Sequence, residues 1–339
     1  MKIENHHISY NQDQNWQYFI GKDKLKSDLK RLNLSKKDMK KLNVSDFEFK
    51  FIAKKDVAKK AINTSEIKKM NDFIMTYEWM ISIPQRSTHY FGAYYKNELA
   101  GVLIFATPNT FDTKIWGEEN KNKVKLLARG ATSGWTPKNL GSSFISYATN
   151  YLVKNTEFRI FYGYSDMGVK YPNGDVQSCG EKGVIYQACN WLYLGQNFGG
   201  KIQYIDPTRQ HKLDGKYTLS GNDEYYHKPF ADRELRKVSF YKKFAQDLSI
   251  EWLKEWGASG RINREIIPTE VFQALKDREK EFAKTLIKLK PLKKRKWCFF
   301  KGRTKKETKK MKKLFLKNNP KMNCFTKCGR LIGYSYPKD

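Results

Sequence analysis

The 339-residue chain carries a formal net charge of +30, from 65 Lys and Arg against 35 Asp and Glu. A hydrophobic share of 40%, with 14% aromatic residues, suffices for a packed core and excludes a chain that is disordered throughout. Such an excess of cations favours a polyanionic partner, and we expect nucleic acid rather than an anionic membrane surface.

The cysteines and the apolar stretches indicate the compartment. Five Cys, an odd number, are scattered over a long chain, which is typical of free thiols in a reducing compartment. The N-terminus has no apolar stretch after its charges, so we expect no signal peptide. Because no run of about 18 apolar residues occurs, we also expect no membrane span and a cytoplasmic protein.

Residues 1–45 predict a basic helical N-terminal element. Leu25, Leu29 and Leu32 recur at helical spacing. Ser35 followed by Asp38 resembles a capping box that opens a second short helix. Two short basic helices suit either a small DNA-binding element or a helical cap on the next domain, and we favour the cap.

From residue 46 to residue 200 the pattern predicts a mixed α/β (α+β) core. Alternating or continuously apolar runs predict strands, and amphipathic runs predict helices. The predicted strands are 46–53, 89–95, 98–108, 123–132, 158–166 and 191–196. The predicted helices are 57–75, 141–155 and 183–192, the second with Phe144, Ala148, Tyr151 and Leu152 on one side.

The remaining chain divides into an insertion and a tail. Residues 201–290 begin with Gly and Asp turns and then predict a long helix over 268–290, so we expect a partly helical insertion. Residues 291–339 hold one more predicted strand, 294–300, and a cationic stretch at 302–319. We find no internal repeat.

A small-residue turn between strand 123–132 and helix 141–155 is the first candidate for chemistry. Lys138, Gly141, Ser142 and Ser143 lie there. Backbone N–H groups at a helix N-terminus bind anions, Gly141 allows a phosphate to approach, and both Ser hydroxyls can donate. An ordinary turn in which Ser caps the helix explains the same residues.

Three further residues are candidates for proton transfer. Tyr186, on a short helix, is either a proton donor or a core phenol. Asp166, at the end of strand 158–166, is either a general base or a loop cap. His89, beside Arg86, Ser87 and Tyr90, is either structural or a base for an anionic substrate.

A metal site is not indicated by the cysteines. Cys324 and Cys328 lie four residues apart, but no second pair and no nearby His completes a tetrahedral zinc site. We therefore predict no metal ligands and leave the requirement for a metal open. A Walker loop, a GxGxxG motif and an HExxH motif are all missing from the sequence.

The order of these segments resembles the GCN5-related N-acetyltransferase (GNAT) superfamily. Lys138-x-x-Gly141-x-Ser143 is similar to its pyrophosphate loop, and Tyr186–Trp191 to its YxxxGF-like helix end. More specifically, the chain resembles the phage Mom-like DNA-modification proteins. The stretches that carry this resemblance are YEWMISIPQRSTHYFGAYYKNELAGVLIF, LLARGATSGW, YSD, GVIYQACNWLYLG, KKRKWCFF and YSYPKD.

This resemblance implies a GNAT-like mixed sheet flanked by helices, with a helical insertion and a basic C-terminal tail. It also implies conversion of adenine in DNA to an N6-carbamoylmethyl derivative, which shields phage DNA from host restriction enzymes. The protein would then act in the host cytoplasm. Residues on positions implicated in the family's active site are His89, Tyr90, Arg129, Ser142, Asp166 and Tyr186.

Two departures from the family pattern concern the acidic residue. The family's Asp-Pro is Asp166-Met167 here, and about ten extra residues, KYPNGDVQSC, precede Tyr186. Asp175 therefore competes with Asp166 for the acidic role. The resemblance covers roughly residues 46–198 and 292–339 and says nothing about 201–290.

On this basis we predict roles. Asp166 or His89 accepts the amine proton, Tyr186 protonates the leaving group, and Tyr90 and Ser142 complete the catalytic set. Arg129, Lys138, Gly141, Ser142 and Ser143 bind an acyl-CoA-like donor. A flipped adenine would stack on Tyr90, Tyr94, Trp135 or Trp191.

Double-stranded DNA is the predicted partner, and the oligomeric state stays open. The residues predicted to contact its phosphates are Lys293, Lys294, Arg295, Lys296, Lys305, Lys306, Lys309, Lys310, Lys312 and Lys313. Two other functions compete: a GNAT acetyltransferase acting on a protein or small amine, and a non-catalytic DNA-binding protein on the same scaffold.

Overall fold

A computed structural model describes the part of the chain on which the fold rests. The described residues are 16–54, 64–78, 83–84, 86–108, 116–166, 168–170, 172, 174, 176–177, 183–196, 203–205, 212–213, 216–217, 225–227, 268–284 and 287–318. Asp175, Cys324 and Cys328, named above as candidates, lie outside them.

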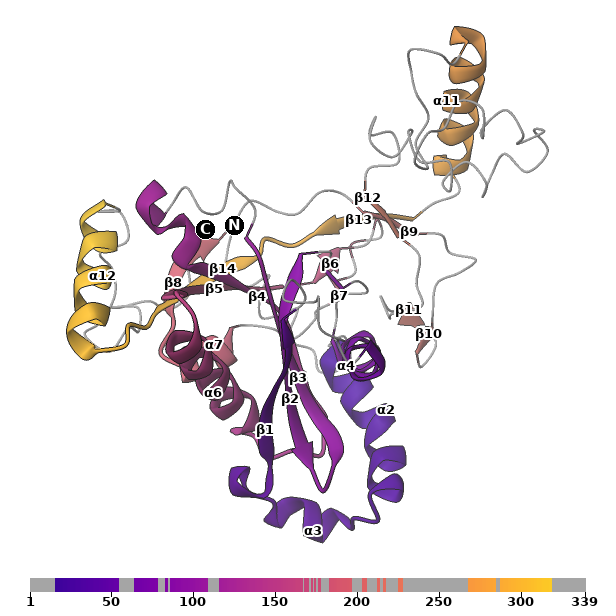
Figure 1. The fold of residues 1–339 in the computed structure, drawn as a ribbon. Helices are drawn as coiled ribbons and strands as arrows, with labels where there is room; N and C mark the ends of the chain where they lie inside the picture. Colours follow the sequence, from indigo (N-terminus) through magenta and orange to yellow (C-terminus); the bar gives the residue numbers. More distant parts are fainter. Residues whose placement is uncertain are drawn as a thin grey trace.

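A seven-stranded sheet forms the centre of the fold, in the order β1-β2-β3-β4-β5-β14-β8 (Figure 1). Neighbouring strands are antiparallel except β4 and β5, which are parallel. The predicted mixed sheet with flanking helices is confirmed. The strands are β1 Glu48–Lys54, β2 Ser87–Tyr95, β3 Glu98–Ala106, β4 Val124–Thr132, β5 Ile160–Ser165, β8 Leu192–Gln196 and β14 Arg295–Phe300.

Helices cover both faces of this sheet, and Figure 1 shows α6 and α4 on either side of β1–β3. On one face, here called the α6 face, α6 (Leu140–Asn155) and α7 (Val184–Ala188) pack against a large aromatic core. On the opposite face, the α4 face, α4 (Thr64–Tyr77) covers β2 and β3, and α12 (Lys305–Asn318) covers β5 and β14. Because both faces are covered, β2 and β3 are buried almost throughout.

The predicted amphipathic pattern of α6 is confirmed. Phe144, Ala148 and Leu152 recur every four residues and are fully buried against the sheet. Tyr151 is half-buried and stacks on Phe51 of β1, with ring centroids 4.8 Å apart. The helix ends where the Thr156 hydroxyl donates to the Leu152 carbonyl at 2.6 Å.

The N-terminal helices α2 (Trp16–Arg31) and α3 (Lys36–Lys41) precede the sheet. The predicted capping box at Ser35 and Asp38 is present. Asp28 of α2 is buried and accepts a 2.6 Å hydrogen bond from the Tyr77 hydroxyl of α4. Burial, followed by this contact with Asp28, raises the pKa of Tyr77, so the phenol stays protonated and joins α2 to α4.

β4 and β5 pair over four residues only. Val124–Leu127 pairs with Ile160–Gly163 in parallel register. Beyond these residues β4 continues beside β3 alone, and β5 continues beside β14 alone. The two strands therefore diverge at Leu127 and Gly163, near the middle of the seven-stranded sheet.

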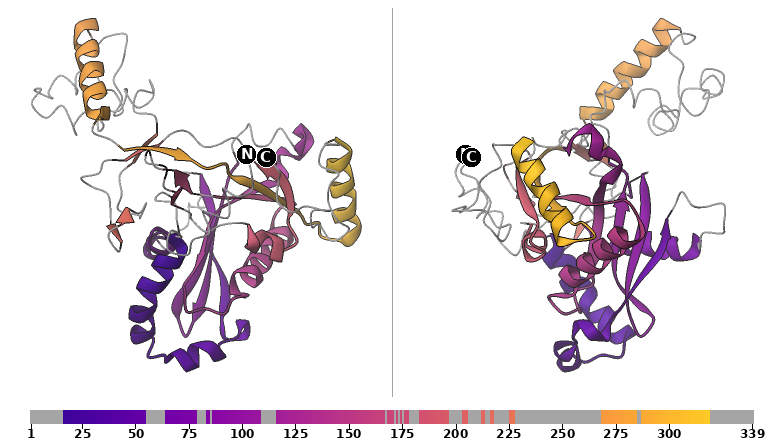
Figure 2. Two further views of the ribbon diagram at one scale, coloured as in Figure 1. Left: turned by 180° about the vertical axis from the view of Figure 1, so that it is seen from behind. Right: turned by 60° about the vertical axis from the view of Figure 1, so that its left-hand side comes forward.

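A second sheet, in the order β12-β9-β13-β6-β7, lies beyond the start of β14 (Figure 2). Its strands are β6 Val169–Lys170, β7 Val176–Gln177, β9 Gln203–Ile205, β12 Tyr225–His227 and β13 Ile287–Pro291. Extra residues after β5 and residues of the 201–290 insertion thus join one sheet. Two short strands, β10 Lys212–Leu213 and β11 Lys216–Tyr217, pair with each other.

The long helix predicted over 268–290 is wrong at its C-terminal end. The helix, α11, covers Thr269–Lys284, and Ile287–Pro291 is strand β13. The apolar residues Ile287 and Leu289 alternate with lysines there, which suits a strand once partners in β6 and β9 are available.

The cationic stretch at 302–319 contains helix α12. Thr304 caps it by accepting from the Glu307 amide at 3.1 Å, and Phe315 is buried beside Trp116. Two 3-10 turns complete the described elements, η2 Val44–Asp46 and η5 Glu118–Lys123. No helix in the described part of the chain is long and apolar enough to cross a membrane.

Candidate active site at the divergence of β4 and β5

The N-terminus of α6 follows β4 after the connecting residues 133–139, so the predicted turn lies between this strand and this helix. Lys138 is exposed two residues before the helix, and Asn139 occupies the N-cap without a side-chain hydrogen bond to the helix. The first turn contains no acidic residue. The Ser142 hydroxyl donates to the Asn139 carbonyl at 3.0 Å, so it serves the turn itself. The helix end is thus suited to an anion.

Gly141 brings α6 close to α7. A Cβ added at Gly141 would lie 3.0 Å from Cδ1 of Ile185, so the missing side chain makes room for α7. Cys189, at the end of α7, donates to the Ser142 carbonyl at 3.6 Å. Burial raises the pKa of the Cys189 thiol to about 12, so this thiol is neutral near pH 7.

Tyr186 of α7 lies over the point where the strands diverge. Its hydroxyl donates a long hydrogen bond, 3.4 Å, to the Tyr164 carbonyl of β5. A Cβ added at Gly163, the last β5 residue paired with β4, would lie 2.6 Å from the same hydroxyl. The ring is buried between Trp191 and Trp297, stacked at 18° on the latter.

Asp166 follows the last residue of β5 and is largely buried. Its Oδ1 accepts from the Gly168 amide at 3.0 Å, and its Oδ2 lies 2.5 Å from Nζ of Lys294. The preceding Ser165 accepts a 2.9 Å hydrogen bond at Oγ from the Trp297 indole. Lys294, just before β14, therefore contacts Asp166, and Trp297 of β14 packs on the ring of Tyr186.

Arg129 lies on the α4 face, away from the Gly141–Ser143 turn with which it was grouped. Its Nε is 3.2 Å from Glu78 Oε2, at the end of α4, and both side chains are largely buried. Arg129 lies on β4 just beyond Leu127, so this ion pair borders the divergence from the opposite face. Sequence reasoning missed Glu78, because nothing in YEWM marks it as a partner of Arg129.

His89 and Tyr90 do not share a site. The His89 ring is 2% exposed on the α6 face, edge-on to Phe158, with Nδ1 2.8 Å from the Thr88 hydroxyl. Tyr90 is buried on the α4 face among residues of α4, where burial raises its pKa. The structural alternative for His89 therefore fits its environment, and the prediction that it accepts the substrate's proton is withdrawn.

The aromatic residues predicted to stack on a flipped base are mostly core residues. Trp135 is fully buried between Phe47 and Tyr95. Trp191 is 2% exposed and stacks on Phe299 at 7°. Tyr94 is half-buried and donates to Glu66 at 2.5 Å. We therefore withdraw Tyr90, Trp135 and Trp191 as stacking residues.

The residues predicted to contact DNA divide into inward and outward groups. Arg295 is 2% exposed, and the Lys296 ammonium lies over the rings of Tyr162 and Tyr164, 4.9 and 5.4 Å from their centroids. Lys294 contacts Asp166. We therefore remove these three from the set of phosphate contacts. The other residues of the predicted set remain candidates for phosphate contact. Their side chains are exposed at Lys293, Lys305, Lys306, Lys309, Lys310 and Lys313, and half-buried at Lys312.

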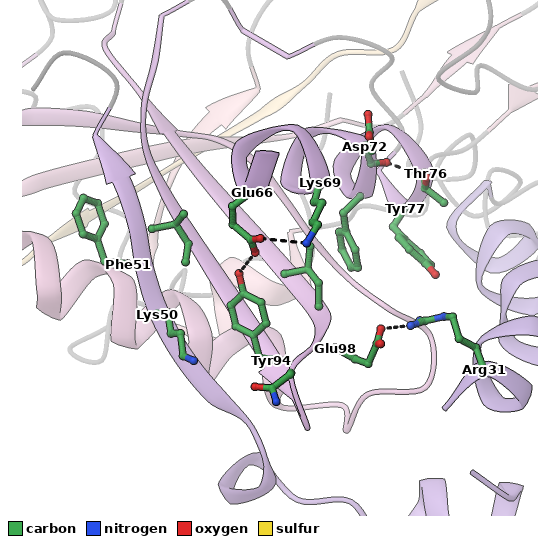
Figure 3. A pocket seen from close by; sticks show the side chains of 14 residues that line it. Arg31, Lys50, Phe51, Glu66, Lys69, Asp72, Thr76, Tyr77, Tyr94 and Glu98 are labelled. Carbon is green, nitrogen blue, oxygen red and sulfur yellow. Dashed lines mark hydrogen bonds and ion pairs between the residues drawn. The ribbon is translucent and has the colours of Figure 1, made fainter. Parts of the chain in front are cut away.

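A cavity of about 860 Å³ lies on the α4 face, and its lining does not include Arg129, Asp166, Tyr186 or the first turn of α6 (Figure 3). Its charged lining residues are all ion-paired: Arg31 with Glu98, Lys69 with Glu66, Lys50 with Glu48 and Asp72 with Lys68. Tyr94 also contacts Glu66 there, as Figure 3 shows. The cavity therefore offers no unbalanced charge for an anionic ligand.

Metal ligands do not cluster in the described part of the chain. No group of three or more His, Cys, Asp or Glu side chains there could hold a metal ion. The residues of the candidate site are the first turn of α6, the Tyr186 phenol, the Asp166 carboxylate and their partners.

A family model identifies the family of this chain. The model of the Mom protein family matches residues 59–245, more than half of the chain. The chain belongs to the Mom protein family. The Mom match spans the candidate residues from Arg129 to Tyr186, whereas Lys294 and Trp297 lie beyond it. It supports a DNA-modification protein. No curated protein matches the sequence.

Solved structures similar to this Mom protein are acetyltransferases. A tandem GNAT protein of clavulanic acid biosynthesis is 11% identical, with a TM-score of 0.36, and 76% of this chain and 99% of that chain are covered. An acetyltransferase of Bacillus subtilis in complex with CoA is 12% identical, with a TM-score of 0.28 and coverages of 53% and 95%. A GNAT acetyltransferase of Elizabethkingia anophelis with acetyl-CoA bound is 10% identical, with a TM-score of 0.25 and coverages of 51% and 92%.

Proposed function

We propose that this protein is a transferase that modifies N6 of adenine in DNA with a carbamoylmethyl or related acyl-derived group, as Mom-like proteins do. One observation carries the proposal. The Tyr186 hydroxyl lies over Gly163, where β4 and β5 diverge, Asp166 follows the end of β5, and the first turn of α6 contacts α7, which carries Tyr186. The modification would protect phage DNA from host restriction enzymes.

The N-terminus of α6 fits the anionic part of an acyl-CoA-like donor. Asn139 leaves the helix end uncapped by its side chain, and the first turn carries no carboxylate to repel an anion. The backbone amides of Gly141 and Ser142 and the exposed Lys138 ammonium would hold a pyrophosphate, whereas the Ser143 amide already donates to the Asn139 carbonyl at 3.1 Å. An acyl-CoA would supply a thioester carbonyl carbon and give an N6-acyl adenine with the CoA thiol as leaving group. A carbamoylmethyl group, which is joined through its CH2 carbon, would need a donor that carries the leaving group on that carbon.

Asp166 is suited to accept the proton of the amine. The adenine amine is a weak nucleophile because its lone pair is delocalised into the ring, so it must lose a proton as the new N–C bond forms. Lys294 and the Gly168 amide hold the carboxylate in one orientation at the end of β5. General-base assistance of this kind contributes about 10²–10⁴ in rate.

Tyr186 is suited to donate a proton to the leaving group as its bond to the transferred carbon breaks. Its ring is fixed by Trp191 and Trp297, which leaves the hydroxyl at the divergence of the strands. Arg129 and Glu78 border this divergence from the α4 face. Arg129 would there orient a phosphate or carboxyl-like group of the second substrate.

DNA would reach the site through phosphate contacts. The exposed α12 lysines Lys305, Lys306, Lys309, Lys310 and Lys313 have no acidic partner among the described residues. The target adenine, buried in a duplex, must be flipped out of the stack to reach Asp166.

Mass spectrometry of nucleosides from DNA co-expressed with the protein tests the proposal. We expect a new adenine adduct that is absent when Asp166→Asn is expressed. Unmodified DNA together with acetyl-CoA turnover on a protein or small amine would instead establish an acetyltransferase. DNA binding without any turnover would establish a non-catalytic DNA-binding protein.

A further inference from the structure

Two lysines lie directly opposite each other in the second sheet. β13 and β6 are antiparallel, and Lys290 pairs with Lys170. Both side chains are exposed, and neither has an ion-pair partner among the described residues. Directly opposed residues of antiparallel strands have Cβ atoms about 4.5–5.5 Å apart, and like charges there destabilise the pair. The free sheet therefore concentrates positive charge that a bound anion would neutralise.

This pair lies close to the candidate catalytic carboxylate. Gly168, just before β6, donates to Asp166 Oδ1 at 3.0 Å and accepts a 2.9 Å hydrogen bond from the Leu292 amide. Lys294, four residues after Lys290, contacts Asp166. Exposed Lys293 lies between these two contacts in the chain. Backbone and side-chain bonds thus hold the lysine pair next to the end of β5.

The pair is separated from the cationic helix α12 by the length of β14. Figure 1 shows β13 and β14 following one another, with the second sheet at one end and α12 at the other. β14 has six residues, which corresponds to about 20 Å at ~3.4 Å per residue. That distance is about six base pairs along a duplex, with one phosphate charge per ~1.7 Å of axis.

We propose that Lys170, Lys290 and Lys293, here called the strand lysines, bind the phosphate backbone of DNA beside the target nucleotide. This inference rests on the proposed function and adds a second phosphate-binding surface to α12. Segments that depart from the family pattern, the extra residues after β5 and the insertion, would thereby form the surface nearest to Asp166. Phosphate contacts of this kind position a duplex without reading its sequence.

The test is the salt dependence of duplex DNA binding by the full chain. Each phosphate contact contributes about 0.9 to the slope of log K against log salt, so Lys170→Gln/Lys290→Gln should reduce the slope by about 2. The charge-retaining Lys170→Arg/Lys290→Arg should keep the wild-type slope. A matched control is Lys121→Gln/Lys154→Gln. It removes two exposed charges away from the second sheet, one on η5, just before β4, and one on α6.

A second readout separates binding from folding. Because the substitution to Gln relieves the repulsion between the lysines, the Tm of the free protein should stay constant or rise. An unchanged slope in Lys170→Gln/Lys290→Gln, or an equal loss in the matched control, would overturn the inference. So would a wild-type chain that does not bind DNA. If wild-type protein yields no adenine adduct while the slopes differ as expected, the proposed function is wrong, and binding of DNA phosphates by the strand lysines is supported.

Discussion

Lys294 Nζ lies 2.5 Å from Oδ2 of Asp166, so a lysine expected to bind DNA phosphate instead contacts the candidate catalytic carboxylate. Lys294 comes immediately before β14, and Asp166 immediately follows β5. Antiparallel pairing of Arg295 with Ser165 brings the two side chains together. Under the proposed function, Lys294 would be a positioning residue for Asp166.

Replacing Lys294 with Met should lower kcat for DNA modification by about tenfold or more, because the carboxylate loses the partner that orients it. The affinity for DNA should change little. Lys294→Arg, which retains the charge and a donor, should restore most of the rate. Separate measurements of kcat and of DNA affinity check this, and a selective loss of affinity would show that Lys294 contacts DNA after all.

Gly163→Ala should lower activity through Tyr186. The new methyl group would lie 2.6 Å from the Tyr186 hydroxyl and displace it from the divergence of the strands. Tyr186→Phe alone should cost about 10²–10⁴ in rate. Since both changes remove the same placed hydroxyl, the double variant should be no slower than Tyr186→Phe, within a few fold. Strictly multiplicative losses in this double-mutant cycle would argue against a shared role.

Cys189 should behave as a structural thiol. Burial raises its pKa from 9.0 to about 12, so iodoacetamide should label it slowly at pH 8 and quickly in urea. The folded state holds its proton more tightly than the unfolded state. Its contribution to stability is therefore complete below about pH 9 and is lost as the pH rises through about 12. Rapid labelling of the native protein at pH 8, located by peptide mass spectrometry, would contradict this.

The exposed lysines of α12, at the far end of β14 from the second sheet, should make the largest contribution to the salt dependence of DNA binding. Lys309→Gln/Lys310→Gln/Lys313→Gln should reduce the slope of log K against log salt by roughly 3 without altering which base is modified. Lys296→Gln is a useful contrast. Its ammonium lies over Tyr162 and Tyr164, so its loss should lower Tm by a few degrees and leave the slope unchanged. A reduced slope in Lys296→Gln, together with an unchanged slope in the α12 variant, would show that β14 rather than α12 contacts DNA.

The elements that were predicted correctly have strong local patterns. β2 and β3 follow from continuous aromatic and β-branched runs, and α6 from apolar residues at every fourth position. The strand β13 was missed because Leu286 and Leu289 continue the periodicity of α11, while the strand pairs with segments far away in sequence. Local patterns do not record such partners.

The candidate site was predicted in outline, and its partners were not. Chain order alone indicated the turn before α6, Asp166 after a strand and Tyr186 on a short helix. The partners Glu78 and Lys294 come from distant segments, and only the fold brings them to Arg129 and Asp166. His89 was a candidate through the family resemblance, and its position within a buried strand favours the structural alternative.

The central claim is that Asp166 takes part in modification of adenine in DNA. Mass spectrometry of nucleosides from plasmid co-expressed with wild-type, Asp166→Asn and Lys154→Gln proteins tests it most directly, with equal soluble expression and equal DNA binding verified. We predict an adenine adduct of carbamoylmethyl or related mass with wild-type and Lys154→Gln, and a loss of about 10² or more with Asp166→Asn. Undiminished adduct with Asp166→Asn, or no adduct with DNA-bound wild-type protein, would contradict the account.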